Sequence, residues 1–237
     1  MKTIIFLLHF LYISTMAYSQ TVYGITGMVK TPTAYSLESG ETCLGFNLFS
    51  DQFQKRYGNK TFQQWSANIN LGFLSFFEAG IRLVGVPKIS IQNSNLPYDY
   101  YIDRTINFKF ILLREKANLP QISFGMQDAI GTRIFNSTYF VASKTINVRD
   151  KSELKFSLGY GTKLSRYIFD KPDNYRLSGF FGGTEIGLYN FASIMLEYDA
   201  KDVNAGISIR PVHWLNLFGY YTSLKDLGCG ISLKFEI

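Results

Sequence analysis

Histidine and cysteine are scarce in this sequence, which argues against most kinds of catalytic and metal site. The chain of 237 residues contains two histidines and two cysteines, with no CxxC or HExxH spacing. A zinc site needs several such ligands close together, and a catalytic triad needs a nucleophile, a base and a group that orients the base. His213 is the only imidazole after His9. We therefore predict no enzyme, no metal site and no cofactor, and interpret His213, beside Trp214, as a polar residue at a membrane interface.

Long apolar runs and aromatic-rich basic runs are also missing. Beyond the N-terminus, no segment approaches the roughly 20 consecutive apolar residues of a membrane helix. The net charge of +6 is not gathered into a basic run, so no nucleic-acid partner is predicted. The N-terminus has one lysine, an apolar stretch over residues 4–13, and small residues at Ala17 and Ser19. This layout predicts a secretory signal peptide over residues 1–19, because the apolar stretch is too short for the alternative, a transmembrane anchor.

Aromatic residues and regular alternation are abundant. Tyr and Phe account for 16 and 21 residues, and both favour β-strands. In QQWSANINLG, the apolar residues Trp65, Ala67 and Ile69 alternate with the polar residues Ser66 and Asn68. Similar runs recur to the end of the sequence. A period of two is typical of a half-buried strand, so no helix is predicted in the exported part.

Twelve alternating runs are predicted as strands, most of them near ten residues long. Strands in globular proteins average about five or six residues, whereas ten tilted residues span roughly the 25 Å apolar band of an outer-membrane barrel. We therefore predict an all-β fold, a transmembrane antiparallel up-and-down β-barrel of about 12 strands over residues 41–237. The alternative is a soluble exported β-sandwich with shorter strands. The predicted strands are 42–50, 62–71, 75–85, 103–112, 120–128, 136–146, 152–160, 176–188, 191–199, 203–210, 213–221 and 228–237.

The connections between these strands indicate the location of the protein. Several long polar connections alternate with short turns, as in barrels of the outer membrane of Gram-negative bacteria, and lipid is then the first partner. Residues 20–40 are rich in Gly, Thr and Ser and precede the first strand. They are predicted to form either a plug in the lumen or a periplasmic segment. Cys43 and Cys229 fall on opposite faces by parity, so two free thiols are predicted rather than a disulfide.

Polar residues on the inward face are the candidate contacts for a transported polymer. Charge is tolerated there because water or other polar groups satisfy it. The acidic pairs Asp99/Asp103 and Glu197/Asp199 are interpreted as loop or lumen residues in preference to a calcium site. The residues alone leave an open lumen and a plugged lumen as alternatives. The predicted lumen residues are Asn68, Asn70, Lys109, Glu153, Lys155, Glu197, Asp199, Asn204 and Arg210.

Three stretches carry a resemblance to a known family: GITGMVKTPTAYSLESG, DRTINFKFILLREKANLPQISFGMQDAIGTRIFNSTYFVASK and EYDAKDVNAG. They resemble the YjbH family of outer-membrane β-barrels, which is linked to exopolysaccharide and capsule export. Its members are longer, and this sequence is similar to their barrel-forming portion. The motif residues expected to have structural roles are Gly27, Pro32, Thr33, Ala34, Asp103, Arg104, Asp128, Gly131, Thr132 and Lys144.

The resemblance implies a non-enzymatic barrel that assists secretion or surface assembly of an exopolysaccharide or capsule, with polysaccharide and other envelope secretion proteins as partners. The tyrosines Tyr98, Tyr100, Tyr101 and Tyr167 are candidates for stacking on sugars or for an aromatic girdle at the membrane surface. Two alternatives remain. One is an outer-membrane diffusion porin, and the other is a lipid hydrolase that uses His213.

Overall fold

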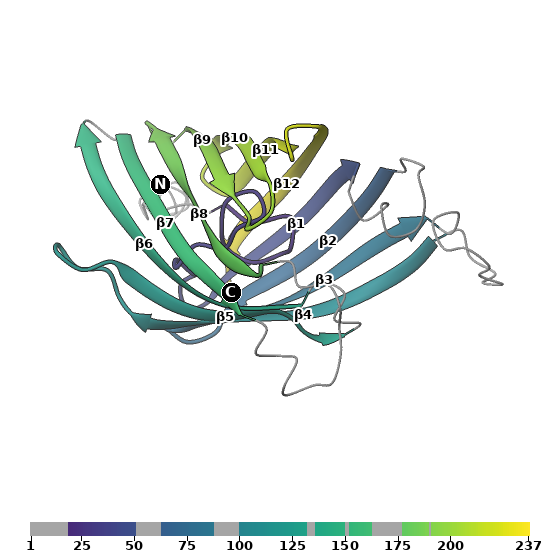
Figure 1. The fold of residues 1–237 in the computed structure, drawn as a ribbon, viewed down its shortest axis with the longest axis horizontal. Coiled ribbons are helices and arrows are strands. Elements are labelled where there is room, and N and C mark those ends of the chain that lie inside the picture. Colours follow the sequence, from purple (N-terminus) through teal and green to yellow (C-terminus); the bar gives the residue numbers. More distant parts are fainter. Residues whose placement is uncertain are drawn as a thin grey trace, which may run out of the picture.

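The computed structural model describes residues 19–50, 63–87, 100–131, 136–149, 152–162, 177–189 and 191–237. Twelve strands follow one another along the chain, and each pairs antiparallel with its neighbours in sequence. β1 also pairs with β12, so the sheet closes into a barrel (Figure 1). No helix in the described part is long and apolar enough to cross a membrane. The strands are β1 (Glu41–Ser50), β2 (Gln63–Gly72), β3 (Phe77–Pro87), β4 (Tyr100–Leu113), β5 (Gln121–Gly131), β6 (Ser137–Arg149), β7 (Ser152–Thr162), β8 (Gly179–Leu188), β9 (Ala192–Tyr198), β10 (Val203–Val212), β11 (Leu215–Thr222) and β12 (Asp226–Glu236).

The predicted all-β fold and its twelve-stranded antiparallel barrel are confirmed. Most strand boundaries differ from the prediction by one to three residues, because register with the neighbouring strand, rather than side-chain alternation, decides where pairing stops. Closure of the barrel is regular: Glu41 pairs with Glu236 at one end of β1, and Phe49 with Gly228 at the other. Pairing on both sides leaves β1 and β12 no free edge, so no row of backbone N–H and C=O groups is left open to another chain or to lipid.

The two ends of the barrel are distinguished by their connections. We call the end at which β1 finishes and β2 begins the loop end. The opposite end, where β1 begins, is the turn end, and it carries short turns such as residues 73–76 between β2 and β3 and residues 213–214 between β10 and β11.

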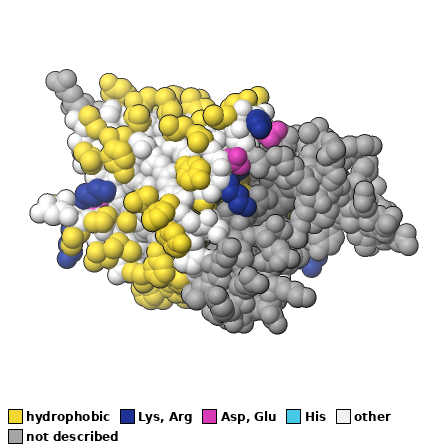
Figure 2. All heavy atoms as spheres, viewed as in Figure 1, with side chains coloured by type: hydrophobic (Ala, Val, Ile, Leu, Met, Phe, Trp, Pro, Cys, Tyr) yellow, Lys and Arg dark blue, Asp and Glu magenta, His cyan; other side chains and the backbone are white. Residues whose placement is uncertain are grey.

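The outer face of the barrel is apolar. Large apolar side chains on nearly every strand are exposed, among them Ile69, Ile81, Ile194 and Ile207. Figure 2 shows hydrophobic side chains gathered over the part of one face that the described residues form. An apolar band of this kind is stable in contact with lipid tails but not with water.

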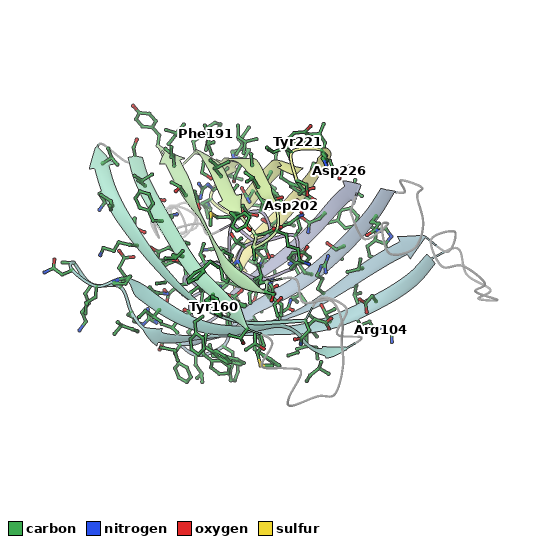
Figure 3. All side chains as sticks on the ribbon, viewed as in Figure 1. Arg104, Tyr160, Phe191, Asp202, Tyr221 and Asp226 are labelled. Carbon is green, nitrogen blue, oxygen red and sulfur yellow. The ribbon has the colours of Figure 1, made fainter. Side chains whose placement is uncertain are left out.

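Aromatic residues border this band at both ends. At the turn end the exposed aromatic side chains include Phe73, Phe76, Tyr189, Phe191 and Trp214, and at the loop end they include Tyr160, Phe180, Tyr198 and Tyr221. Figure 3 labels three of them, Tyr160, Phe191 and Tyr221. Aromatic girdles at the two membrane–water interfaces are typical of outer-membrane barrels.

Residues 19–37 lie inside the barrel, and we call this segment the plug. Every one of them is buried, and Figure 1 shows the segment in purple, surrounded by the strands. Two bridges fold it into compact turns: Gln20 pairs with Thr26, and Gly27 pairs with Pro32. Backbone polar groups buried in this way need partners, and the inward side chains of the strands supply many of them.

The two cysteines are free thiols, as predicted. Cys43 is buried and Cys229 is exposed on the outer face, because the two positions have opposite parity in their strands. We expect a membrane-permeant maleimide to label Cys229 rapidly in the folded protein and Cys43 only after denaturation. Mass spectrometry of the labelled peptides measures both. Equal labelling of the two thiols before denaturation would contradict the inward orientation of Cys43.

Candidate functional site in the barrel lumen

Residues 26–33 of the plug form a hairpin, and a single carboxylate on β9 holds its turn. Glu197 accepts hydrogen bonds from the backbone N–H groups of Val29, Lys30 and Thr31 at 3.0, 2.7 and 3.1 Å, and from the Thr31 hydroxyl at 2.7 Å. The amide of Asn204 on β10 donates to the same carboxylate at 3.0 Å. Charge-assisted hydrogen bonds in a buried site are stronger than neutral ones. Glu197 is therefore the main anchor of residues 29–31.

The hairpin is also held by charge and shape. The ammonium of Lys30 lies 3.6 Å from a carboxylate oxygen of Asp199, and both side chains are largely buried. Val29 packs against the backbone of Gly206 on β10: a Cβ added at Gly206 would lie 2.7 Å from Cγ2 of Val29. A side chain at position 206 would therefore push the hairpin away from the wall.

A buried ion pair on the opposite wall holds Thr26 and Thr33, at the two ends of the hairpin, and Tyr35, which follows it. Lys109 on β4 lies 3.4 Å from Glu78 on β3, and neither side chain is more than 1% exposed. Glu78 accepts from the N–H and hydroxyl of Thr26 at 2.9 and 2.8 Å. Lys109 donates to the carbonyl oxygens of Thr26, Thr33 and Tyr35. Because both charges are satisfied by the plug as well as by each other, displacing the plug would leave them short of partners.

Ala34 of the plug is held against β5 and β6 by both its backbone and its side chain. The backbone N–H of Ala34 donates to the Ser143 hydroxyl at 2.8 Å, and its carbonyl oxygen accepts from Gln121 and Ser123. The Ala34 side chain is fully buried in a cluster with Tyr139, Val141, Leu177 and Phe181. A residue larger than alanine would have to displace these side chains, which gives a packing reason for the small residue at this position.

Tyr35 connects the plug to the turn between β4 and β5. Its hydroxyl lies 2.7 Å from Glu115 and 2.6 Å from the Thr145 hydroxyl, and Glu115 is also paired with Lys144 at 3.0 Å. Partial burial favours the protonated form of Glu115, but hydrogen bonds from Tyr35, Thr145 and Lys144 outweigh burial and hold the pKa of this carboxyl below its usual value. The contribution of Glu115 to stability is therefore present above its unfolded pKa and is lost as the pH falls through the lowered one.

Gly27 lies at a place in the plug where no side chain fits. A Cβ added here would lie 2.3 Å from the carbonyl oxygen of Thr31 and 2.4 Å from Cγ2 of Thr21. We expect Gly27→Val to open the hairpin and to lower the midpoint temperature of the heat-dependent gel shift by several degrees, since strained or overpacked sites cost about 1–3 kcal/mol. Gly219→Val is the matched control, because the nearest described atom to a Cβ there is 3.9 Å away. An equal effect of the two variants would contradict the close packing of the hairpin.

Four charged residues near the turn end form a second lumenal cluster, whose ion pairs join strands of the wall to one another. Lys155 on β7 lies 2.7 Å from Glu153 and 3.8 Å from Glu185, and Arg210 lies 4.0 Å from Glu185. The side chains of Lys155, Glu185 and Arg210 are less than 10% exposed. This cluster ties β7, β8 and β10 together through opposite charges.

The predicted lumen residues lie on the inner wall and divide between two groups: Asn68, Lys109, Glu197, Asp199 and Asn204 belong to the network around the plug, and Glu153, Lys155 and Arg210 belong to the second lumenal cluster. Asn68 donates to the side chain of Gln20 in the plug at 2.6 Å. Asn70 is buried, and its amide oxygen fills the space beside Gly80 on β3: a Cβ added at Gly80 would lie 1.6 Å from that oxygen. The sequence alone did not show that Lys109, Glu197 and Asp199 bind the plug.

The family-motif residues divide between the plug, the inner wall and the outer face. Asp103 is inward and buried, whereas Arg104 is exposed on the outer face of β4 (Figure 3). Asp128 has a positive φ of 48° at a bulge between β4 and β5, and its N–H donates to Asn107. Gly131 has a φ of 141°, and a Cβ there would lie 2.1 Å from the Arg104 carbonyl oxygen. Thr132, Tyr98 and Tyr167, residues 1–18 of the signal peptide predicted over residues 1–19, and the side chains of Tyr100 and Tyr101 lie outside the described residues, whereas Ser19 is described and is buried in the plug.

Several wall residues that hold the plug were not singled out from the sequence, among them Glu78, Arg82, Asn107, Gln121 and Ser123. Glu78 and Arg82 follow the same parity as the other inward residues of β3, opposite the outward Ile81, so alternation alone was sufficient to place them. Arg82 lies over the ring of Tyr23 in the plug, 5.2 Å from its centre. Their role in holding the plug depends on the path of residues 19–37, which alternation does not predict.

The described residues hold no cluster of three or more His, Cys, Asp and Glu side chains arranged for a metal ion. Asp99, one of the candidate calcium ligands, lies outside the described residues, and Glu197 is occupied by the plug. His213 is exposed in the turn between β10 and β11. The chemistry that the described lumen offers is therefore hydrogen bonding and charge pairing.

Comparison with known proteins connects this arrangement to a family and a fold. Residues 19–174 match the model of the YjbH family, described as "Exopolysaccharide biosynthesis protein YbjH". The uncharacterized lipoprotein YjbH of Escherichia coli (strain K12) is 31% identical over 145 residues, which are 60% of this chain and 18% of that protein. The chain therefore spans less than a fifth of that relative's length. The solved structure of the KdgM porin superposes with a TM-score of 0.50 and 10% identity over 83% of this chain and 99% of that one, which supports the barrel fold alone.

Proposed function

Because this chain belongs to the YjbH family of exopolysaccharide biosynthesis proteins, we propose that it is a non-enzymatic outer-membrane barrel, closed by its own plug, that assists secretion or surface assembly of an exopolysaccharide or capsule. One observation carries the proposal. The match over residues 19–174 contains both the plug and most of the wall residues that bind it, including Glu78, Lys109 and Ser143. The sequence that identifies the family thus includes the sequence that closes the barrel.

In this proposal the plug is a gate. At rest, the bonds from Glu78, Lys109 and Glu197 hold residues 26–35 across the lumen, which keeps small solutes from leaking through the membrane. The wall groups in these bonds are polar and lie within the lumen. A polymer or an envelope partner that offers its own hydrogen-bonding groups can therefore take the place of the plug at them. The lumen then opens without unfolding of the strands.

The experiment that tests this function is removal and restoration of the gene in its own organism. We expect the deletion strain to release less exopolysaccharide or to display less capsule, and the wild-type gene to restore the amount. Chemical assay of the polymer in the medium and on washed cells measures both. An unchanged amount and surface distribution of every extracellular polysaccharide in the deletion strain would contradict the proposal.

The two other functions suggested by the sequence make different predictions. A diffusion porin would show steady conductance as purified, whereas a plugged barrel shows little. A hydrolase would depend on His213, the only histidine beyond the predicted signal peptide. We expect His213→Ala to restore polymer release in the deletion strain as fully as the wild-type gene does, because this side chain is exposed in a turn. Loss of complementation by a normally inserted His213→Ala protein would favour a catalytic role.

A further inference from the structure

Inward polar side chains on β1 to β6 continue beyond the plug toward the loop end. On β2 the plug binds Asn68, and the next inward positions toward the loop end are Ser66 and Gln64. On β5 the plug binds Gln121 and Ser123, and Gln127 lies closer to the loop end. We call these residues, with their neighbours at the same end, the loop-side wall. It consists of Asn47, Gln64, Ser66, Asp103, Gln127 and Ser137, and each is no more than 2% exposed.

Two amides of this wall have no hydrogen-bond partner among the described residues. Both side-chain atoms of Gln64 and both of Gln127 are buried and unpaired, and the nearby hydroxyls of Thr138 and Tyr139 are unpaired too. Buried polar groups are nearly always satisfied, because an unpaired one costs about 1–3 kcal/mol. Whole amides left unpaired on two separate strands can therefore gain hydrogen bonds from a ligand or from water once the groups that cover them move away.

The charged residues of the lumen indicate whether that ligand is acidic or uncharged. The inward lysines of the described strands each have a carboxylate partner: Lys109 with Glu78, Lys155 with Glu153 and Glu185, and Lys234 with Glu41. In the plug, Lys30 is paired with Asp199; of the inward arginines of these strands, Arg210 is paired with Glu185 and Arg82 lies over the ring of Tyr23. An acidic polymer would need cations that are not already neutralised. Amides, in contrast, both donate and accept, as the hydroxyl groups of a neutral sugar do.

We infer that the loop-side wall is a binding site for uncharged sugar residues, in which Gln64 and Gln127 hydrogen-bond to the sugar hydroxyls. This inference rests on the proposed function and adds to it the chemical class of the polymer and the place where it is held. The site lies nearer the loop end than the residues that hold the plug. A glycan bound there would therefore contact the plug on the face that points toward the loop end.

The test is binding of defined glycans to the purified, detergent-solubilised full-length protein. An array of neutral and uronic-acid oligosaccharides selects the probe, and calorimetry with the best neutral oligosaccharide measures its affinity. We expect neutral glycans to bind and uronic-acid glycans to bind no more tightly. We expect Gln64→Ala/Gln127→Ala to lower the affinity about tenfold, since each lost hydrogen bond contributes a few-fold. Ser193→Ala is the matched control, because its buried hydroxyl also lacks a partner within the described part of the chain but lies on β9, outside the wall.

Each result decides for or against the site. Absence of neutral-glycan binding indicates that water alone satisfies the amides and overturns the inference, as does tighter binding of uronic-acid glycans. Equal affinity of wild type and double variant overturns the assignment of the two glutamines. If the double variant loses its heat-dependent gel shift and so does not fold, the affinities of the single variants Gln64→Ala and Gln127→Ala are compared with that of the wild type instead. If the protein binds no neutral glycan but still restores polymer release in cells, this inference is wrong and the proposed function is not affected.

Discussion

Replacing Glu197 with alanine is expected to release the hairpin of the plug and to turn a nearly silent barrel into a conducting one. The substitution leaves three buried backbone N–H groups, those of residues 29–31, without their acceptor. Each unsatisfied donor costs about 1–3 kcal/mol, so the plugged arrangement loses several kcal/mol relative to an open one. Single-channel recording in planar bilayers measures the result. Glu197→Gln keeps an acceptor oxygen and should give an intermediate open fraction.

Protease accessibility gives an independent measure of the same release. Lys30 is 3% exposed in the plugged barrel, so trypsin should not cut between Lys30 and Thr31 in the wild type but should do so in Glu197→Ala. Glu185→Ala is the matched control: this carboxylate is also buried in the lumen, but its ion pairs are with Lys155 and Arg210 of the wall. Closed channels and a protected Lys30 in a correctly folded Glu197→Ala protein would rule out Glu197 as the anchor of the plug.

Replacing Lys109 with methionine is expected to cause a large loss of stability, greater than that from breaking the second lumenal cluster. The ammonium is fully buried, pairs with Glu78 and donates to three carbonyl oxygens of the plug. Removing one partner of a buried pair strands the other charge and costs about 3–5 kcal/mol. Urea unfolding followed by the heat-dependent gel shift measures the free energy of unfolding.

A second substitution separates the lost ion pair from the lost plug contacts. In Lys109→Met/Glu78→Gln no charge is stranded, so part of the stability should return, while the plug remains loosened and Lys30 is cut by trypsin. Lys155→Met is the control, because it breaks the ion pairs of the second lumenal cluster, which join wall residues to one another. A Lys109→Met protein as stable as wild type would show that the pair does not hold the plug.

The barrel was predictable from the sequence because lipid and a polar lumen impose opposite demands on alternate residues. Ile69, Ile81 and Ile207 face outward and Asn68, Lys109 and Glu197 face inward, as period-two patterning requires. The eighth strand shows the limit of the pattern. Predicted from residue 176, it begins at Gly179, because pairing with β7 starts at Gly161.

The plug was less predictable, for a physical reason. Residues 19–37 have no period that favours a strand or a helix, and their conformation is set by side chains far away in sequence, such as Glu78 and Glu197. The sequence therefore indicated an irregular segment before the first strand without indicating which carboxylate binds which turn. The charged residues of the wall likewise suggested a polar passage or a closed interior, and only the path of the plug distinguishes the two.

A cross-link between plug and wall tests the central claim most directly. A Cβ added at Gly206 on β10 would lie 2.7 Å from Cγ2 of Val29 in the plug, so cysteines at positions 29 and 206 are close enough to be joined, and the bond between them removes the clash that another side chain at position 206 would make. In a chain without Cys43 and Cys229, Val29→Cys/Gly206→Cys should oxidise to an intramolecular disulfide in isolated outer membranes. The linked protein should keep its heat-dependent gel shift and remain closed in bilayers, even when Glu197 is replaced with alanine. An unlinked pair in a folded outer-membrane barrel, or a linked barrel that conducts freely, would contradict a lumen closed by residues 19–37.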